Sequence, residues 1–205
     1  MAFYHERSFF IMKNTNTRKL VEAAVMVAMA TVLCFIRLYK LPWGGSVTLL
    51  SMLPICIYSI RRGVKWGMAA SFVFSLIQLL QGIIDGLFGW GLTPGALIAC
   101  ILLDYILAYS AIGLAGMFAK KGVAGQISGI VIAVVVRFFV HFLSGCLLWK
   151  SYGALWDGFE TNNTYLYSLL YNGAYMLPEL IITVIGAVIL LSIPATKKAI
   201  LAVEE

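Results

Sequence analysis

The stretch VVVRFFVHFLSGCLLW, residues 134–149, has the length and apolar character of a membrane-spanning helix, yet it carries Arg137 and His141 four positions apart. An ionisable side chain at the centre of a bilayer costs about 2.5–3.5 kcal/mol on insertion scales. Such a side chain therefore needs a partner, a polar cavity or a position near the membrane surface. The stretch predicts a bundle of membrane helices with a polar site in its interior.

The composition of the whole chain agrees with a membrane environment. Hydrophobic residues make up 61% and charged residues 12% of the sequence, with a mean hydropathy of +0.93. Soluble domains have about 45–50% apolar and about 25% charged residues. The 205 residues can supply about six helices of roughly 20 residues with short loops. We expect an all-α membrane protein with six transmembrane helices and no extramembrane module such as an ATPase.

Breaks in the apolar pattern divide the chain into six expected spans. These are residues 20–38, 47–60, 64–84, 95–118, 123–149 and 165–193. The second is shorter than a typical span, so its length alone leaves its state open. We expect a six-helix transmembrane domain over residues 20–198, flanked by an N-terminal tail (1–19) and a C-terminal tail (199–205).

Lysine and arginine residues are concentrated in alternate loops, which predicts the orientation of the chain. One set of loops carries Arg7, Lys13, Arg18, Lys19, Arg61, Arg62, Lys65, Lys120, Lys121, Lys197 and Lys198. The other set is rich in tryptophan and mildly acidic, although it also holds Arg37, Lys40 and Lys150. By the positive-inside rule both termini are cytoplasmic. The net charge of +6 thus reports topology, and we expect no nucleic-acid partner.

Motifs of common enzymes and metal sites are missing from the sequence. It has no G-x-x-x-x-G-K-[ST], no H-E-x-x-H and no Ser/His/Asp arrangement in a suitable context. The four cysteines stand alone in apolar segments, without the C-x-x-C spacing of metal or redox sites. We expect a protein that is not an enzyme and that holds no metal and no cofactor.

Six polar residues inside the expected spans are the informative ones: Glu22, Asp104, Arg137, His141, Asn172 and Glu179. Glu22 is near the expected cytoplasmic end, within reach of headgroups. Glu179 is deeper, and both a pair with Arg137 and another role are open for it. Arg137 itself either pairs with an acid or lines the floor of a site.

Helical spacing groups several of these residues with aromatic ones. His141, Gly145 and Trp149 follow one another at intervals of four and share a helix face. Asp104 and Tyr105 belong to one helix with Tyr109, and Tyr167 and Asn172 lie on the last helix. Taken singly, each could be a packing residue. Together an acid, a histidine, an amide and several aromatic rings suit a small organic cation.

Four segments resemble the thiamin-specific substrate-binding subunits, or S-components, of energy-coupling-factor transporters, the ThiT (YuaJ) family. They are GGSVTLLSMLPICIYSIRRGVKWG, LLDYILAYSAIGLAG, RFFVHFLSGCLLW and YSLLYNGAYMLP, which occur in this order. The resemblance implies the six-helix S-component fold in a bacterial cell membrane, with thiamin held near the outer face. It also implies uptake through a coupling subunit, EcfT, and two ATPase subunits that use ATP.

The resemblance also implies which residues contact the ligand. The family's site residues fall on Asp104, Tyr105, His141, Gly145, Trp149, Tyr167 and Asn172. Trp43 falls near the position of a lid residue, and Trp90 is a candidate for an aromatic residue before the fourth helix. Ala24 and Ala28 form a small-x-x-x-small pair, which the family uses to dock on the coupling subunit. Internal packing is the alternative for this pair.

Three other functions remain open from the sequence. A different vitamin could be the ligand of the same kind of subunit. A self-sufficient secondary carrier would need a coupling-ion site and usually two related halves, neither of which is visible. A membrane-embedded enzyme would need a catalytic constellation.

Overall fold

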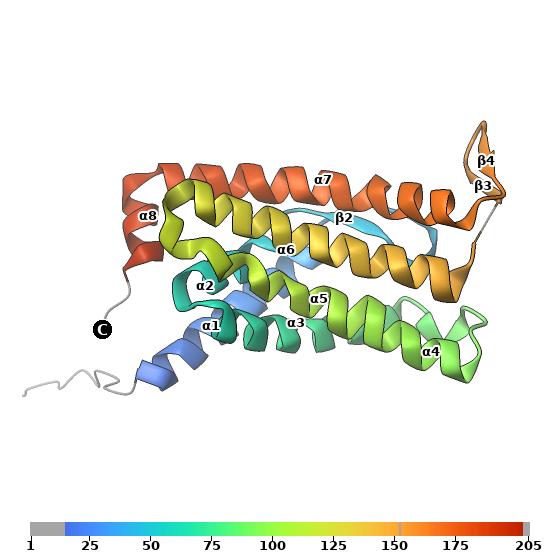
Figure 1. Cartoon of the computed structure of the whole chain (residues 1–205). Helices are drawn as coiled ribbons and strands as arrows, with labels where there is room; N and C mark the ends of the chain where they lie inside the picture. Colours follow the sequence, from blue (N-terminus) through green and yellow to red (C-terminus); the bar gives the residue numbers. More distant parts are fainter. Residues whose placement is uncertain (1–14, 152, 203–205) are drawn as a thin grey trace, which may run out of the picture.

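The computed structural model describes residues 15–151 and 153–202, and its long helices lie lengthwise side by side in one bundle (Figure 1). The helices are α1 (Thr15–Cys34), α2 (Leu53–Arg62), α3 (Val64–Ile84), α4 (Pro94–Cys100), α5 (Ala108–Ser110), α6 (Gly122–Ser144), α7 (Thr164–Ser192) and α8 (Pro194–Leu201). Two antiparallel hairpins join β1 (Arg37–Lys40) to β2 (Ser46–Thr48) and β3 (Gly153–Trp156) to β4 (Phe159–Thr161). The expected tail boundaries, 19/20 and 198/199, fall inside α1 and α8.

Short helical segments of other types complete the chain. Tight 3₁₀ segments are η1 (Pro42–Gly44), η2 (Leu87–Gly89) and η4 (Ala111–Lys121), and wide π-helical segments are η3 (Ile101–Leu107) and η5 (Gly145–Trp149). Segments α4, η3, α5 and η4 follow one another as one rod, and η5 continues α6 (Figure 1).

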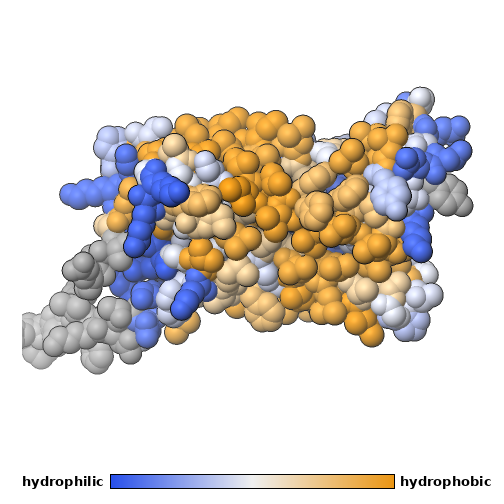
Figure 2. All heavy atoms as spheres, viewed as in Figure 1, coloured by the Kyte–Doolittle hydropathy of each residue, from blue (hydrophilic) through white to orange (hydrophobic). Residues whose placement is uncertain are grey.

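Three helical stretches among the described residues are long and apolar enough to cross a membrane: Val64–Ile84, Pro94–Trp149 and Thr164–Ser192. The second has 56 residues, far more than the roughly 20 that one crossing needs. It turns back where Phe118 leaves helical geometry and Gly122 has a φ of +70°, and α6 then packs along η4. On the face seen in Figure 2, apolar side chains cover the middle of the bundle and hydrophilic side chains lie at its ends.

The second expected span differs from the prediction. Residues 46–48 form β2, and the helix covers only Leu53–Arg62. Pro54 stands in its first turn, where the fixed φ of proline suits helix initiation. The first helix begins and ends earlier than the expected span 20–38, because the chain leaves the helix after Cys34 and forms β1, which pairs with β2. Helix α2 is buried from Leu53 to Ile60 and forms the centre of the core.

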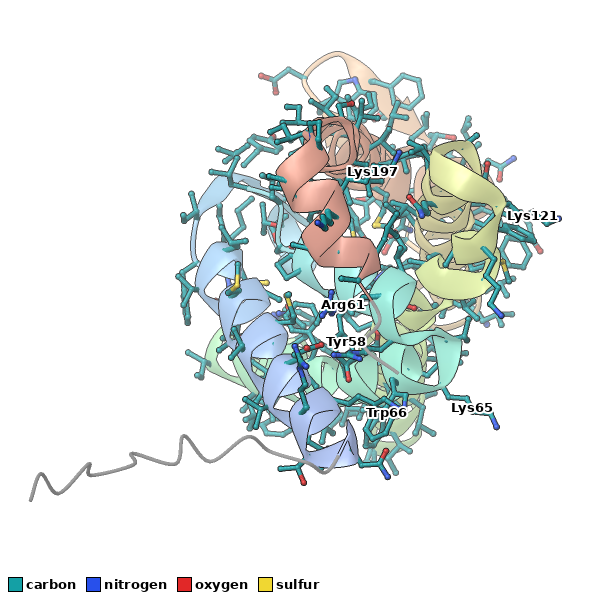
Figure 3. The ribbon with its side chains drawn as sticks, turned by 90° about the vertical axis from the view of Figure 1, so that its left-hand side faces the viewer. Tyr58, Arg61, Lys65, Trp66, Lys121 and Lys197 are labelled. Atoms are coloured by element: carbon teal, nitrogen blue, oxygen red, sulfur yellow. The ribbon has the colours of Figure 1, made fainter. Side chains whose placement is uncertain are left out.

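Many of the basic residues gather at the end of the bundle that carries α8 (Figure 3). There Glu22 pairs with Arg61 at 3.1 Å and with Arg62 at 2.5 Å, and Arg61 donates hydrogen bonds to carbonyl oxygens of α8. These contacts tie α1, α2 and α8 together, so Glu22 has a structural role. We call the opposite end, which carries β3 and β4, the hairpin end.

Candidate functional site

A cavity of about 110 Å³ opens at the hairpin end, between η3, η5, α6 and α7. Its wall also includes Trp90, from the loop after α3, and the turn between β1 and β2. The lining residues are Gly44, Gly45, Ser46, Trp90, Cys100, Asp104, Tyr105, Tyr109, Arg137, His141, Gly145, Trp149, Ser151, Tyr167, Ser168, Tyr171, Asn172 and Tyr175. Five tyrosines and two tryptophans line the wall, and Asp104 is the only acid in it among the residues that the structure describes.

Asp104 is the centre of the polar contacts in this wall. One carboxylate oxygen lies 3.0 Å from Nδ1 of His141. The other accepts a hydrogen bond from the Ser144 hydroxyl at 2.5 Å and a longer one from the Trp149 indole at 3.4 Å. Nε2 of His141 is buried and has no hydrogen-bond partner among the described residues. Because buried polar atoms in proteins are nearly always hydrogen-bonded, this nitrogen of a cavity-lining residue is a candidate contact for a ligand.

The backbone around the cavity is wider than an ordinary α-helix. Asp104 and Tyr105 lie in the π-helical segment η3, and Gly145 and Trp149 lie in η5. A π-helix has a hydrogen-bond pattern of i→i+5 and is rare, and where it occurs it is often at a functional site. Both wide segments are at the same end of the bundle, where they provide space for the cavity.

Helix α7 contributes a hydrogen-bonded row of side chains. The Asn172 amide nitrogen donates to the Ser168 carbonyl oxygen at 2.9 Å, and its oxygen accepts from the Tyr175 hydroxyl at 2.8 Å. Ser168 lies against Gly145, where an added Cβ would be 2.2 Å from the Ser168 hydroxyl oxygen. The absence of a side chain at Gly145 therefore allows η5 to approach α7 closely.

Arg137 has no ion pair within the described part of the chain, although the buried acid Glu179 is a candidate partner for it. Its guanidinium lies over the ring of Tyr109, 4.1 Å from the centroid, and one of its nitrogens lies 2.9 Å from the Met52 sulfur. Glu179 instead accepts hydrogen bonds from the backbone and hydroxyl of Thr48. The cation is stabilised by an aromatic face and lines the cavity floor.

A smaller polar cavity of about 50 Å³ lies beside the first and shares Tyr105, Tyr109 and Arg137 with it. Glu179, Asp85 and Arg37 are also in its wall. Arg137 and Glu179 each leave one buried polar atom without a partner among the described residues. A cavity of this size and polarity can hold a few water molecules that satisfy these atoms.

Comparison with known proteins identifies the family. A family model described as "Thiamine transporter protein (Thia_YuaJ)" matches residues 20–199. The chain belongs to the Thia_YuaJ family. This is a family of transporters and not of enzymes, so the expectation that the chain is not an enzyme is confirmed, as is the resemblance drawn from the four segments.

Named members and a solved structure of the Thia_YuaJ family match most of the chain. "Thiamine transporter ThiT" of Bacillus subtilis (strain 168) is 32% identical over 181 residues, which cover 82% of this chain and 86% of the relative. The protein of the same name from Lacticaseibacillus paracasei is 28% identical over 190 residues, covering 85% and 87%. A solved structure of ThiT from Listeria monocytogenes matches with a TM-score of 0.71 and 28% identity, covering 92% of this chain and 100% of that one. Together with the apolar helices, these relatives place the chain among multi-pass bacterial membrane proteins.

The cavity brings together most of the residues that the sequence singled out. Asp104, Tyr105, His141, Gly145, Trp149, Tyr167 and Asn172 all line it, and so does Trp90. The side chain of Trp43 lies outside the described part of the structure, so its predicted role as a lid residue stays a prediction. Ala24 and Ala28 are on α1, away from the cavity, and both are exposed.

Several lining residues were missed. Tyr171 and Tyr175 follow Tyr167 at intervals of four on α7, and consecutive members of this row lie 6.3 Å and 6.0 Å apart, centroid to centroid. This spacing in YLYSLLYNGAY was a signal for a shared face. Ser144, which donates to Asp104, had no comparable signal because serine is common in membrane helices.

Proposed function

We propose that the chain is the thiamin-binding subunit of a bacterial importer and that it captures thiamin in the cavity at the hairpin end. The observation that carries this proposal is the pair formed by Asp104 and His141 in a wall that also has five tyrosines and two tryptophans. Thiamin has a fixed positive charge on its thiazolium ring and an exocyclic amine on its pyrimidine ring. The carboxylate suits the charge, and the unpartnered Nε2 of His141 can accept a hydrogen bond from the amine.

The aromatic residues and Asn172 complete the proposed site. Trp149 and Trp90 lie 5.6 Å apart, centroid to centroid, at a tilt of 57°, so that a flat cationic ring can stack on one of them. Tyr105 and Tyr167 contribute further faces, and Gly145 leaves room beside them. Asn172 keeps a lone pair on its amide oxygen and holds Tyr175 in place. Trp43 is proposed as a residue that covers the ligand.

The proposed topology follows from the charge pattern. Both termini and the α8 end, with its basic residues, face the cytoplasm, while the hairpin end and its cavity face outward. The transmembrane domain covers residues 20–198 with six membrane segments, including the short buried α2, between tails at 1–19 and 199–205. The chain itself uses no cofactor.

Thiamin binding tests the proposal directly. The purified chain, in detergent and without ATP or a partner, is expected to bind thiamin with a change in Trp emission, because Trp149 and Trp90 line the cavity. Asp104→Asn keeps an acceptor but removes the charge. A hydrogen bond to a charged group contributes about 1.5–3 kcal/mol, so this variant should bind at least about tenfold more weakly.

Two measurements separate a ligand role of Asp104 from a structural one. The melting temperature of Asp104→Asn should stay near that of the unaltered chain, and affinity for pyrithiamine, whose pyridinium keeps the cation, should fall in parallel with affinity for thiamin. A variant that melts several degrees lower and still binds both ligands normally would show that Asp104 does not belong to the site.

We further propose that transport requires a membrane-embedded coupling subunit, EcfT, with two ATPase subunits. Its support is the orientation of α1. Val27 and Ala30 face the core, with 7% and 0% exposure, whereas Ala24 and Ala28 face outward. A pair of small residues on an exposed helix face lets another helix approach closely. Internal packing within this chain does not account for the pair.

Tryptophan at both Ala24 and Ala28 tests the docking face. The double variant should bind thiamin normally, because both positions are remote from the cavity, but should abolish uptake by cells that contain the coupling subunits. Loss of thiamin binding as well would indicate that Ala24 and Ala28 pack against other helices of this chain. Proton-coupled uptake by the unaltered chain alone in liposomes would favour a self-sufficient carrier instead.

A further inference from the structure

One side of the ligand cavity is closed by the cover segment, which we define as residues 37–48, comprising β1, η1 and β2. Gly44, Gly45 and Ser46 of this segment line the cavity. Gly44, with a φ of +94°, also lies against Trp90, and an added Cβ would be 3.1 Å from that indole ring. A ligand cannot pass this side of the cavity unless the cover segment moves.

The two ends of the cover segment are fastened differently. At β2, the Thr48 backbone and hydroxyl both donate to Glu179, whose side chain is buried with 3% exposure. At β1, Asp85 pairs with Arg37 at 2.9 Å and with Lys40 at 3.2 Å. About a quarter of the Asp85 and Arg37 side chains and nearly half of Lys40 remain exposed. The Thr48 contact is therefore buried and the Asp85 contacts are partly exposed, while β1 and β2 stay paired as one hairpin with Arg37 opposite Thr48.

Little apolar packing holds the β1 end down. Leu38 and Tyr39 are 57% and 59% exposed, and the polar cavity of about 50 Å³ lies between this segment and α3. The turn is held by hydrogen bonds with the Tyr171 hydroxyl, which accepts from the Gly45 amide at 3.3 Å and donates to the Pro42 carbonyl oxygen. Leu41, which follows β1, packs against the core, so the ion pairs and hydrogen bonds hold this part of the segment together with that apolar contact.

Asp85 is well suited to act as the releasable contact. Burial alone would raise the pKa of its carboxyl group, but hydrogen bonds from Arg37 and Lys40 and their charges outweigh that effect and lower this pKa below its ordinary value of 3.8. The carboxylate therefore stays charged at physiological pH. It comes from the C-terminal end of α3, whereas both cations come from β1, so a single side chain links two loops that meet at the cavity.

We infer that Asp85 is a positioning residue that clamps the cover segment closed through Arg37 and Lys40, and so sets how long a bound ligand stays in the cavity. This inference rests on the proposed thiamin site for its ligand. The contacts of the clamp are all formed within this chain. It acts on the rate of opening rather than on contacts with the ligand, because Asp85 does not line the ligand cavity.

The test uses the full-length chain in detergent and the variant Asp85→Asn, with Asp157→Asn as a matched control. Asp157 is an exposed acid at the turn between β3 and β4. Thiamin dissociation is followed by stopped-flow Trp fluorescence. Loss of two partly exposed ion pairs corresponds to about a 2- to 30-fold change in an equilibrium constant, so Asp85→Asn should raise koff by about that factor. Asp157→Asn should leave it within about twofold.

Salt and a conservative variant distinguish a clamp from general damage. Raising salt from about 0.05 M to about 1 M should speed dissociation from the unaltered chain and bring it close to Asp85→Asn, since exposed charges are screened. Asp85→Glu should restore most of the slow dissociation. A koff for Asp85→Asn that equals that of the unaltered chain, or a difference that high salt does not reduce, would overturn the inference.

Hydrogen–deuterium exchange without ligand keeps the two proposals apart. Asp85→Asn should speed exchange of the amides in residues 37–48 and leave α6 and α7 unchanged. If Asp85→Asn speeds exchange in residues 37–48 but the unaltered chain does not bind thiamin, the clamp is supported and the proposed function is rejected. Thiamin binding with unchanged exchange and unchanged koff would support the function and reject the clamp.

Discussion

The two ends of the bundle are built from the same rods, but they are packed in opposite ways. Toward the α8 end, glycines bring backbones together: an added Cβ at Gly113 would lie 2.5 Å from the Met68 amide nitrogen, and one at Gly129 would lie 2.2 Å from the Ala115 carbonyl oxygen. The Ser59 hydroxyl bridges the same region by donating to the Gly113 carbonyl oxygen at 2.5 Å. Toward the hairpin end, the same rods contain π-helical turns and surround a cavity.

The contrast shows how a small membrane protein can hold a binding site without a large core. Helices in lipid gain little from the hydrophobic effect when they associate, so close packing of small residues has to hold them. The close approaches to backbone atoms lie at one end, around Ser59 and the glycines, where Tyr58 and Ile112 are fully buried. The other end can then keep polar side chains and empty space. If this division is correct, substitutions at the two ends should affect different measurements.

The largest effect on stability is expected for Gly113→Ala. The new Cβ would meet backbone atoms of Gly67 and Met68, which cannot rotate away, so α3 and η4 must separate. Overpacking of this kind typically costs about 1–3 kcal/mol, which should appear as a clear fall in melting temperature in detergent. Thiamin affinity of the fraction that remains folded should change little.

Gly173→Ala is the matched control for this substitution. It is also a glycine in a helix, but nothing lies within 4 Å of an added Cβ. Because alanine restricts the unfolded chain more than glycine does, it should be neutral or stabilising by up to about 1 kcal/mol. Equal melting temperatures for Gly113→Ala and Gly173→Ala would contradict the division into a packed end and an open end.

Much of the bundle could be predicted from the sequence, because lipid imposes a simple pattern on helices. The expected span 64–84 matches α3 at both ends, and 165–193 differs from α7 by one residue at each end. The candidate site was visible for the same reason. An acid such as Asp104 or a cation such as Arg137 stands out within an apolar run. Placing a charged side chain in the membrane costs free energy, so such a residue indicates a partner or a polar cavity.

The features that were missed depend on contacts between distant segments. No local pattern signals the π-helical turns of η3 and η5, because they arise where neighbouring rods leave space. For Arg137 the sequence left open a pair with an acid or a place on the floor of the site, and it did not indicate the neighbours found, the Tyr109 ring and a sulfur atom 85 positions away in sequence. The pairing of Asp85 with Arg37 and Lys40 joins two loops whose separate sequences give no sign of it.

The smallest effect is expected at Gly145, where η5 approaches α7 closely at the open end. A Cβ there would meet the Ser168 hydroxyl oxygen at 2.2 Å and the Ser168 Cβ at 3.0 Å. Unlike the backbone atoms at Gly113, this hydroxyl can rotate away, but it would then lose its hydrogen bonds to the Phe142 carbonyl oxygen and the Asn172 amide. Gly145→Ala should therefore weaken thiamin binding about 3- to 10-fold, the equivalent of roughly one neutral hydrogen bond, with little change in melting temperature.

A second substitution shows whether Ser168 is the cause of that loss. Ser168→Ala removes the clashing hydroxyl while Asn172 keeps its bond to the Ser168 carbonyl oxygen at 2.9 Å. In a double-mutant cycle, Ser168→Ala should recover part of the affinity lost in Gly145→Ala, because the two residues are in direct contact and their effects should not add. Strictly additive losses would mean that Gly145 acts on the ligand itself. The missing side chain at Gly145 would then make room for thiamin and not for α7.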